Sequence, residues 1–360
     1  MNKIALKVSL LAIALVLTGA GCSFGGKKQA AALGAAGMFV SADKGETWQS
    51  SSALPTAKGV ANLSGMSVYK LFSDPQDSGA LYWASRENGF VYSYDEGRSW
   101  QQPAGDLQKG YVYSIAVSPS DKCVIYVSTG DRIVKSEDCN RSWTEVYRES
   151  RPNARIASLA INPNESKQVL AAENNGDLLE SVDEGKSWYT ISRFNTELAD
   201  IFADKLQKDV FYLASINAGL FRSIDKGQTW KSLADKMKDF SKANEYRRFS
   251  MQPEVSGRLY WISTYGILLS ADSGSTWEAI NLITPPGSAQ IYGFAVNPKN
   301  TDEIYYTATI NNRSTFYKSV DGGVRWTTKK LPSGQLPTVL YVHPEKADVL
   351  YLGFTMIPKK

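Results

Sequence analysis

The sequence predicts an all-β fold: a seven-bladed β-propeller in which the N-terminal and C-terminal segments share one blade. Three observations support this prediction. An octapeptide of the general form Ser-x-Asp-x-Gly-x-Ser/Thr-Trp occurs seven times, a proline precedes a strand at a fixed distance in most of the intervening units, and each end of the chain holds an incomplete unit. A repeat of this kind is the sequence signature of a propeller.

The octapeptides divide the chain into units of similar length. Successive copies are 42 to 52 residues apart, which is the range expected for blades of four strands. The aspartates of the seven copies are Asp43, Asp95, Asp138, Asp183, Asp225, Asp272 and Asp321.

A proline in a turn marks the second strand of each unit. It stands six residues before the first of two apolar residues in six units, and Lys205 takes its place in the remaining one. The prolines are Pro75, Pro119, Pro163, Pro253, Pro298 and Pro344. This common register predicts that all units fold alike.

Each unit is predicted to contain four strands, A to D. The second unit shows YSIAVSP, VIYVS, RIVKS, the octapeptide turn SEDCNRSW, and TEVYR. The alternation of apolar and β-branched residues favours strands throughout, apart from a short polar stretch at 232–243 that could be helical. The chain begins with only strand C and an octapeptide and finishes with only strands A and B. Pairing these ends closes the ring and leaves no free sheet edge.

The octapeptide is expected to stabilise a turn rather than to do chemistry. Asp and Ser side chains accept hydrogen bonds from turn amides, and Gly supplies a positive φ. Asn140 replaces this Gly in the third copy, and Asn is the next-best residue for that conformation. The Trp would pack between strands. Calcium binding is the alternative, but a calcium loop needs several oxygen ligands and each copy offers one carboxylate. We therefore predict no metal and no cofactor.

The first residues predict an export signal. Lys3 and Lys7 precede an apolar run at 8–17, which is too short to span a bilayer, and TGAG then leads to Cys22. This segment resembles the lipobox of bacterial lipoproteins, although Gly19 stands where Leu is usual. We expect a signal peptide at 1–21, lipidation at Cys22, a tether at 22–36 and the propeller at 37–356. The protein would then be extracytoplasmic and membrane-anchored. Plain secretion is the alternative.

Two further cysteines, Cys123 and Cys139, are predicted to form a disulfide. An exported chain with an even pair favours one, because that compartment is oxidising. Cys123 begins strand B and Cys139 follows strand C of the same blade, so counting outward from the turn near Asp131 places them nearly opposite each other. Two reduced, half-buried thiols are the alternative.

Composition and motifs argue against several function classes. The chain has a net charge of +4, two of the positive charges lie in the leader, and no long Lys/Arg run is present, so we expect no nucleic-acid partner. His343 is the only histidine and precedes Pro344, which predicts a turn residue rather than an acid–base group or zinc ligand. Without a phosphate loop or a nucleophile elbow, we expect no catalytic residues.

The octapeptide is the Asp box of sialidases, sortilin-type receptors and related propellers. A sialidase would also need an Arg-Ile-Pro motif near the first blade, but AAGMFVSADKG holds no Arg there. The whole region 37–356 resembles the photosystem II stability/assembly factor family. That resemblance implies a non-catalytic, exported and often lipid-anchored propeller that holds protein partners during assembly. The alternative is a carbohydrate-active enzyme, such as a sialidase-like glycoside hydrolase, or a sugar-binding module.

The register also predicts a partner-binding face. The proline turns and the octapeptides lie at one end of their strands, whereas the B–C turns and the starts of the A strands lie at the other end. Tyr and Arg, the residue types enriched at interaction hot spots, gather at the second end. The predicted set is Tyr69, Lys70, Arg86, Tyr113, Arg132, Arg155, Arg247, Arg248, Tyr265, Tyr292 and Arg313. The alternative is that Tyr merely favours strands and Arg is solvated. We expect a monomer that binds an exported or membrane protein.

Overall fold

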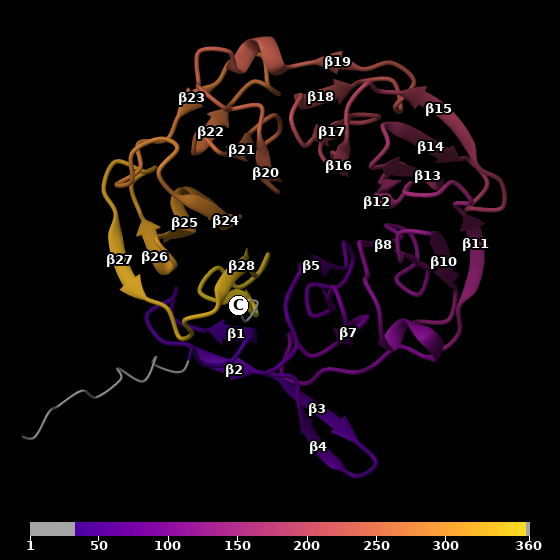
Figure 1. The fold of residues 1–360 in the computed structure, drawn as a ribbon, viewed down its shortest axis with the longest axis horizontal. Coiled ribbons are helices and arrows are strands. Elements are labelled where there is room, and N and C mark those ends of the chain that lie inside the picture. Colours follow the sequence, from indigo (N-terminus) through magenta and orange to yellow (C-terminus); the bar gives the residue numbers. More distant parts are fainter. Residues whose placement is uncertain (1–32, 358–360) are drawn as a thin grey trace, which may run out of the picture. The chain divides into compact units, whose positions relative to one another are not determined.

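The computed structural model describes residues 33–357, and these residues form a ring of antiparallel sheets around a central axis (Figure 1). The predicted all-β, seven-bladed propeller is confirmed. The predicted signal peptide and Cys22 lie outside the described residues. None of the helices in residues 33–357 has the length and apolar character needed to cross a bilayer.

Within each blade the strands run from the central axis outward in chain order, except in the closing blade. The first three blades contain β5 (Lys70–Ser73), β6 (Leu81–Ala84) and β7 (Phe90–Ser93); β8 (Ser114–Val117), β9 (Ile125–Ser128), β10 (Arg132–Ser136) and β11 (Thr144–Arg148); and β12 (Ile156–Asn162), β13 (Glu165–Glu173), β14 (Asp177–Ser181) and β15 (Tyr189–Arg193). In the first of these the outer strand is reduced to one bridge, between Tyr92 and Gln101.

The next three blades repeat this plan. They contain β16 (Leu198–Ala203), β17 (Phe211–Ser215), β18 (Gly219–Ser223) and β19 (Lys231–Ser232); β20 (Tyr246–Met251), β21 (Leu259–Ser263), β22 (Ile267–Ser270) and β23 (Glu278–Ala279); and β24 (Gln290–Asn297), β25 (Asn300–Ile310), β26 (Arg313–Ser319) and β27 (Thr327–Lys330).

The seventh blade joins the two ends of the chain, as predicted. Its order is β28 (Leu336–Val342), β29 (Leu350–Thr355), β1 (Gly37–Ser41) and β2 (Gln49–Ser51). The joint pairs Met38 with Gly353 and Ser41 with Leu350. A Cβ atom on Gly353 would lie 2.6 Å from Val68, so only glycine fits where this blade packs against the next one.

Three short elements lie outside the repeated plan. A hairpin of β3 (Ala53–Thr56) and β4 (Gly59–Asn62) projects from the ring between the seventh and first blades (Figure 1), and it was not predicted. The polar stretch at 232–243 forms a single 3-10 turn, η2 (Ala234–Met237), and η1 (Gly105–Gln108) links the first two blades.

The octapeptides, or Asp boxes, form hydrogen-bonded turns. In the third blade, Asp183 accepts bonds from the amide of Ser187 (2.9 Å) and from the hydroxyls of Ser187 (2.6 Å) and Ser181 (2.8 Å). The amide of Gly185 donates to Ser181 Oγ at 2.8 Å. These bonds, above all those from Ser187, lower the pKa of Asp183 to about 2. The carboxylate is therefore committed to the turn.

The box glycine also sets the spacing between blades. At Gly185, φ is +89° and a Cβ atom would lie 3.2 Å from Tyr126 of the preceding blade. At Gly45 a Cβ would lie 2.7 Å from Phe316, again in the preceding blade. The box Trp lies in the same layer: Trp100 is fully buried and donates to the carbonyl of Ser51 at 3.0 Å. The boxes thus connect turn geometry to the apolar layers between blades.

Candidate functional site

The ring has two distinct faces, as the register predicted. Each Asp box bonds to the A–B turn of its own blade, for example Lys44 N to Asp348 O (2.9 Å) and Lys226 N to Asp209 O (3.0 Å). Proline turns and Asp boxes therefore share one side, which we call the box face. The A-strand starts and B–C turns form the opposite side, which we call the strand-start face.

A cavity of about 1540 Å³ follows the central axis between the two faces. Eight of the eleven residues predicted for the partner-binding face line it, namely Tyr69, Lys70, Arg86, Tyr113, Arg155, Arg247, Arg248 and Tyr292. The strand starts thus bring residues from five blades together at one mouth of the cavity.

The other three predicted residues lie away from the cavity lining. Arg132, on β10, pairs with Asp106 and lies 3.9 Å from Glu145. The ring of Tyr265 packs against Phe240, with centroids 5.2 Å apart. Arg313 is exposed beside the tip of the β25–β26 hairpin. These residues share the face in register but do not contribute to one site with the other eight.

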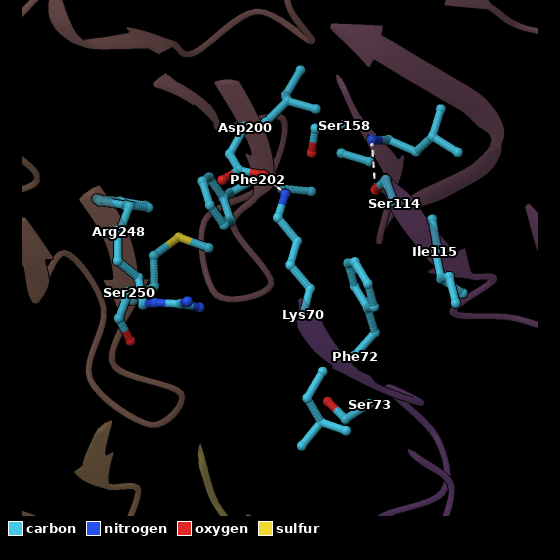
Figure 2. A pocket seen from close by; sticks show the side chains of 18 of the residues that line it. Lys70, Phe72, Ser73, Ser114, Ile115, Ser158, Asp200, Phe202, Arg248 and Ser250 are labelled. Carbon is cyan, nitrogen blue, oxygen red and sulfur yellow. Dashed lines mark hydrogen bonds and ion pairs between the residues drawn. The ribbon is translucent and has the colours of Figure 1, made fainter. Parts of the chain in front are cut away.

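An ion pair crosses the cavity between two blades that are not neighbours. Lys70 on β5 reaches across to Asp200 on β16, as Figure 2 shows. Tyr246 on β20 donates from its hydroxyl to the other carboxylate oxygen of Asp200, at 2.8 Å. Burial and the Asp200 charge raise the pKa of Tyr246 well above its usual value, so this hydroxyl keeps its proton.

Sequence reasoning missed Asp200 and Tyr246, although a signal for Asp200 was present. Lys70 stands five residues before Pro75, and Asp200 stands five residues before Lys205, which occupies the proline position of its unit. Equal register places both at the same height on the inner strands. Opposite charges at that height predict a contact across the axis.

Arg247 and Arg248 have different roles despite being adjacent. Arg248 donates to the carbonyls of Tyr292 (2.6 Å) and Thr338 (2.7 Å), and so it braces the fifth blade against the sixth and seventh. Arg247 lies over the Tyr292 ring, 5.6 Å from its centroid, and its nearest polar partners, the hydroxyls of Thr264 and Tyr292, are 3.3 and 3.5 Å away. Arg247 is therefore the freer of the two to engage a ligand.

The guanidinium groups at the mouth contact neutral partners. Arg86 lies over the rings of Tyr69 and Tyr111, and Arg155 donates to the carbonyl of Ala154 at 2.6 Å. Together with Arg247, they present positive charge that no carboxylate contact within residues 33–357 neutralises. Such a mouth attracts acidic groups.

Below the ion pair the cavity wall becomes apolar towards the box face. Phe72 and Phe202 lie one step further along their strands from Lys70 and Asp200 (Figure 2), and Tyr341 and Met251 also line this part. Ser114 and Ser158 stand five residues before Pro119 and Pro163, so these small side chains occupy the height of the ion pair on β8 and β12. The site thus combines a polar mouth with an apolar interior.

Three aspartates of the cavity wall are engaged in holding the fold. Asp74 accepts the amide of Gln76 (2.7 Å) and Asp204 accepts the amide of Leu206 (2.8 Å), each closing an A–B turn, while Asp200 pairs with Lys70. Within residues 33–357 no cluster of three or more His, Cys, Asp and Glu side chains is placed to hold a metal ion.

His343 occupies the same turn position as these aspartates. Its Nδ1 accepts the amides of Glu345 and Lys346, both at 3.1 Å, and the side chain is fully buried. Burial lowers the pKa of His343, and two incoming amides require an unprotonated Nδ1. The histidine is a turn residue with a neutral ring.

Neither a family model nor a curated protein sequence matches the chain. Solved structures do. The GH74 xyloglucanase from Xanthomonas campestris superposes with a TM-score of 0.63 at 17% identity, covering 81% of this chain and 51% of the enzyme. YCF48 from Cyanidioschyzon merolae gives 0.60 at 12% identity, covering 81% of this chain and 95% of YCF48. YCF48 bound to D1 peptide gives 0.59 at 15% identity, covering 82% and 94%.

What these proteins share with the chain is the fold. This chain spans about half the length of the xyloglucanase but nearly the whole of YCF48. One neighbour is named a xyloglucanase and the other has been solved with a bound peptide, so the fold alone assigns no function to this chain.

Proposed function

We propose that the chain is a non-catalytic, lipid-anchored, extracytoplasmic propeller that binds a protein partner on its strand-start face, in the manner implied by its resemblance to photosystem II stability/assembly factors. The observation that carries this proposal is the mouth of the cavity, where Arg86, Arg155 and Arg247 present unpaired positive charge beside tyrosine rings. Arg and Tyr in a partly buried setting are typical of protein interfaces. The peptide complex of YCF48 supports peptide binding by a propeller of similar length.

The carbohydrate alternative has weaker support in the cavity. Retaining and inverting glycosidases use two carboxyl groups on either side of the bond they cleave. Of the six carboxyl groups that line the cavity, Asp74 and Asp204 close turns and Asp200 is held by Lys70 and Tyr246, so using any of these three as an acid or base would break a structural contact. The other three belong to Glu197, Glu254 and Glu345. We therefore favour binding over hydrolysis.

The proposed anchor would hold the strand-start face near the membrane. Leu33 contacts the β27–β28 linker on this face: its carbonyl accepts the Gly334 amide at 2.7 Å, and Ser333 Oγ donates to the Ala35 carbonyl at 2.6 Å. Ten residues lie between Cys22 and Leu33, so the eleven residue steps span at most about 40 Å of extended chain. A lipid at Cys22 would thus keep the face within reach of membrane-proximal segments of a partner.

The test of partner binding is crosslinking capture from membranes with an Arg155→Glu/Arg247→Glu variant. Reversing two charges at the mouth should reduce capture strongly and change the thermal unfolding temperature little, because the Arg155 guanidinium donates to the adjacent Ala154 carbonyl and Arg247 makes only long contacts, to the Thr264 and Tyr292 hydroxyls. The matched control is Lys186→Glu, an exposed charge reversal on the box face. If the double variant still captures the partner and Lys186→Glu does not, the partner binds the box face and the proposal is wrong.

The anchor has a separate test. Cys22→Ser should release the protein from the membrane fraction or leave it unprocessed, because the residue proposed to carry the lipid is gone. Fractionation and metabolic lipid labelling identical to those of the unaltered chain would contradict the anchor.

A further inference from the structure

A continuous strip of aromatic and guanidinium groups crosses the first three blades at the cavity mouth. It begins at Arg86, whose guanidinium carbon lies 5.0 Å from the Tyr69 ring centroid and 5.8 Å from that of Tyr111. The Tyr69 and Tyr111 rings meet edge to face at 5.0 Å, and Tyr111 then stacks on Tyr113 at 3.8 Å with an interplanar angle of 16°. The rings thus support one another.

Gly130 extends the strip to Arg155. This residue lies in the β9–β10 turn with φ +94°, and a Cβ atom there would lie 2.7 Å from the Tyr113 ring and 3.0 Å from Arg155 Cδ. Both side chains therefore rest on the bare backbone of one residue, which is possible only because it is glycine. The Asn174 side chain accepts the Arg155 backbone amide at 2.7 Å and so fixes the backbone from which the Arg155 side chain extends.

The order of groups along the strip is a cation, a platform of rings and a second cation. Four members of the strip line the cavity: Tyr69, Arg86, Tyr113 and Arg155. Tyr111 is not part of the lining, and its ring contacts those of Tyr69 and Tyr113. Ring platforms bind other rings by offset or edge-on contact, and guanidinium groups bind carboxylates in a bidentate manner. A ligand that matches this order carries a ring between two acids.

An extended peptide provides this arrangement. Side chains at positions i and i+2 of a strand project to the same side and lie about 6.6 Å apart. An acidic residue two positions before and two positions after an aromatic residue would therefore present carboxylate, ring and carboxylate in the order of the strip. Because the cations of the strip lack carboxylate contacts within residues 33–357, the charges are complementary.

We propose that Arg86, Tyr69, Tyr113 and Arg155 form a specificity strip for an acidic, extended peptide segment with the pattern acid-x-aromatic-x-acid. This rests on the proposed function of the strand-start face and names the class of segment that it recognises. Tyr111 and Gly130 act as positioning residues, because they hold the strip together without lining the cavity.

The experiment uses the full-length chain purified in detergent and a labelled peptide, Gly-Ser-Asp-Ala-Phe-Ala-Asp-Ser-Gly, with binding followed by fluorescence anisotropy. Replacing Phe by Ala in the peptide should weaken binding roughly five- to tenfold. Replacing either Asp by Asn should weaken it by about tenfold at low salt and reduce the salt dependence. Tyr113→Leu, which keeps an apolar side chain but removes the ring, should abolish the preference for Phe over Ala.

Controls separate the strip from general charge attraction and from misfolding. Arg313→Glu reverses an exposed charge beside the β25–β26 hairpin tip and should leave peptide affinity unchanged, whereas Arg86→Glu should reduce it. Equal unfolding temperatures exclude loss of fold. The strip is refuted if the Phe and Ala peptides bind equally well, if the peptide does not bind, or if xyloglucan oligosaccharide binds in its place and Tyr113→Leu abolishes that binding.

The strip and the proposed function can fail independently. If the crosslinked membrane partner is captured but the peptide does not compete with it, partner binding stands and the strip is wrong. If the peptide binds with the expected pattern but no partner is captured, the strip stands and the protein-partner function is wrong.

Discussion

Replacing Glu173 by Gln should remove a pH dependence of stability that originates in one buried cluster. Glu173 ends β13, its side chain is fully buried, and one oxygen has no partner within the described residues. Its other oxygen lies 2.5 Å from Arg151, which also contacts Glu149 (2.7 Å) and Asp177 (2.5 Å). Arg193 lies 3.4 Å from Asp177, and Tyr147 donates to Glu149 at 3.2 Å. Three carboxyl groups therefore share two guanidinium groups.

Protonation of Glu173 leaves two carboxylate charges beside the two guanidinium charges of this cluster. Burial and the neighbouring Glu149 carboxylate raise the pKa of Glu173 to about 8, whereas the Arg151 guanidinium holds the pKa of Glu149 well below its usual range. In the unfolded chain Glu173 would ionise near its ordinary value of 4.5. Between these two values the folded state holds the extra proton, so the free energy of unfolding falls as pH rises.

The magnitude follows from proton linkage. One extra proton on the folded state changes the free energy of unfolding by up to about 1.4 kcal/mol per pH unit. Between pH 6 and pH 8, the ionisation of Glu173 should therefore lower the free energy of unfolding by about 2–3 kcal/mol. The lowered pKa of Glu149 acts in a different window, because its contribution is present above 4.5 and is lost only as pH falls below that value.

Urea unfolding of the unaltered chain and Glu173→Gln at pH 6, 7, 8 and 9 measures this contribution. A Gln side chain stays neutral at every pH, so the variant should lack this loss. Its stability advantage over the unaltered chain should grow by about 2–3 kcal/mol between pH 6 and pH 8, and the two profiles should converge only towards pH 4.5. The control is Glu87→Gln, an exposed carboxyl in the β6–β7 turn, which should change neither value. Parallel pH profiles for the unaltered chain and Glu173→Gln would show that Glu173 is ionised in the fold and that the reasoning is wrong.

Three further predictions concern the framework of the ring. Cys123 and Cys139 form the predicted disulfide and enclose a separation of 16 residues, so Cys123→Ser/Cys139→Ser should lower the free energy of unfolding by about 3 kcal/mol in urea; an unchanged midpoint would contradict a stabilising bridge. Ser223→Ala leaves the buried amide of Gly227 without its 2.9 Å acceptor and should cost about 1–3 kcal/mol in thermal unfolding, whereas a neutral result would mean that the box hydroxyl is dispensable. Because burial lowers the pKa of His343, the free energy of unfolding of the unaltered chain should fall as pH drops below 6.5. His343→Asn keeps an acceptor for the turn amides and should lose less stability between pH 7 and pH 5. Equal losses in urea unfolding would count against a neutral His343.

Much of the fold could be predicted because the sequence repeats its turn chemistry. The box and the proline fix both ends of strands B and C in each unit, and the alternation between them determines the inner and outer faces. The same reasoning placed Cys123 opposite the end of strand C, where the Cys139 amide now bonds to the Cys123 carbonyl at 3.3 Å. The β3–β4 hairpin escaped prediction because it belongs to no unit, and its strands have little apolar alternation.

The sequence predicted where the candidate site lies, but not which of its side chains contact one another. The register of each unit determines how far along the inner strand a residue lies. Because the inner strands surround one axis, residues at equal positions along these strands lie close to one another. Eight of the predicted residues therefore line the cavity. The side chains at that height then interact across blades that are far apart in the chain, as Lys70 does with Asp200. The register shows that the two charges share a height, but the contact itself follows from how the assembled ring places their blades.

Contacts between blades also explain why Arg248 and Glu173 are held or buried in the structure, although their positions in the sequence suggest solvated charges. Both occupy ends of strands that face the strand-start side, where a charged residue is ordinarily solvated. Arg248 is instead held by carbonyls of two other blades, and Glu173 is buried by Arg151, which enters from the β11–β12 linker of the preceding blade. Linkers between blades vary in length and lack the repeated motif, so the contacts that they make follow from the assembled ring. Charged residues on this face therefore divide into those that bind the ring together and those, such as Arg155 and Arg247, that remain available to a partner.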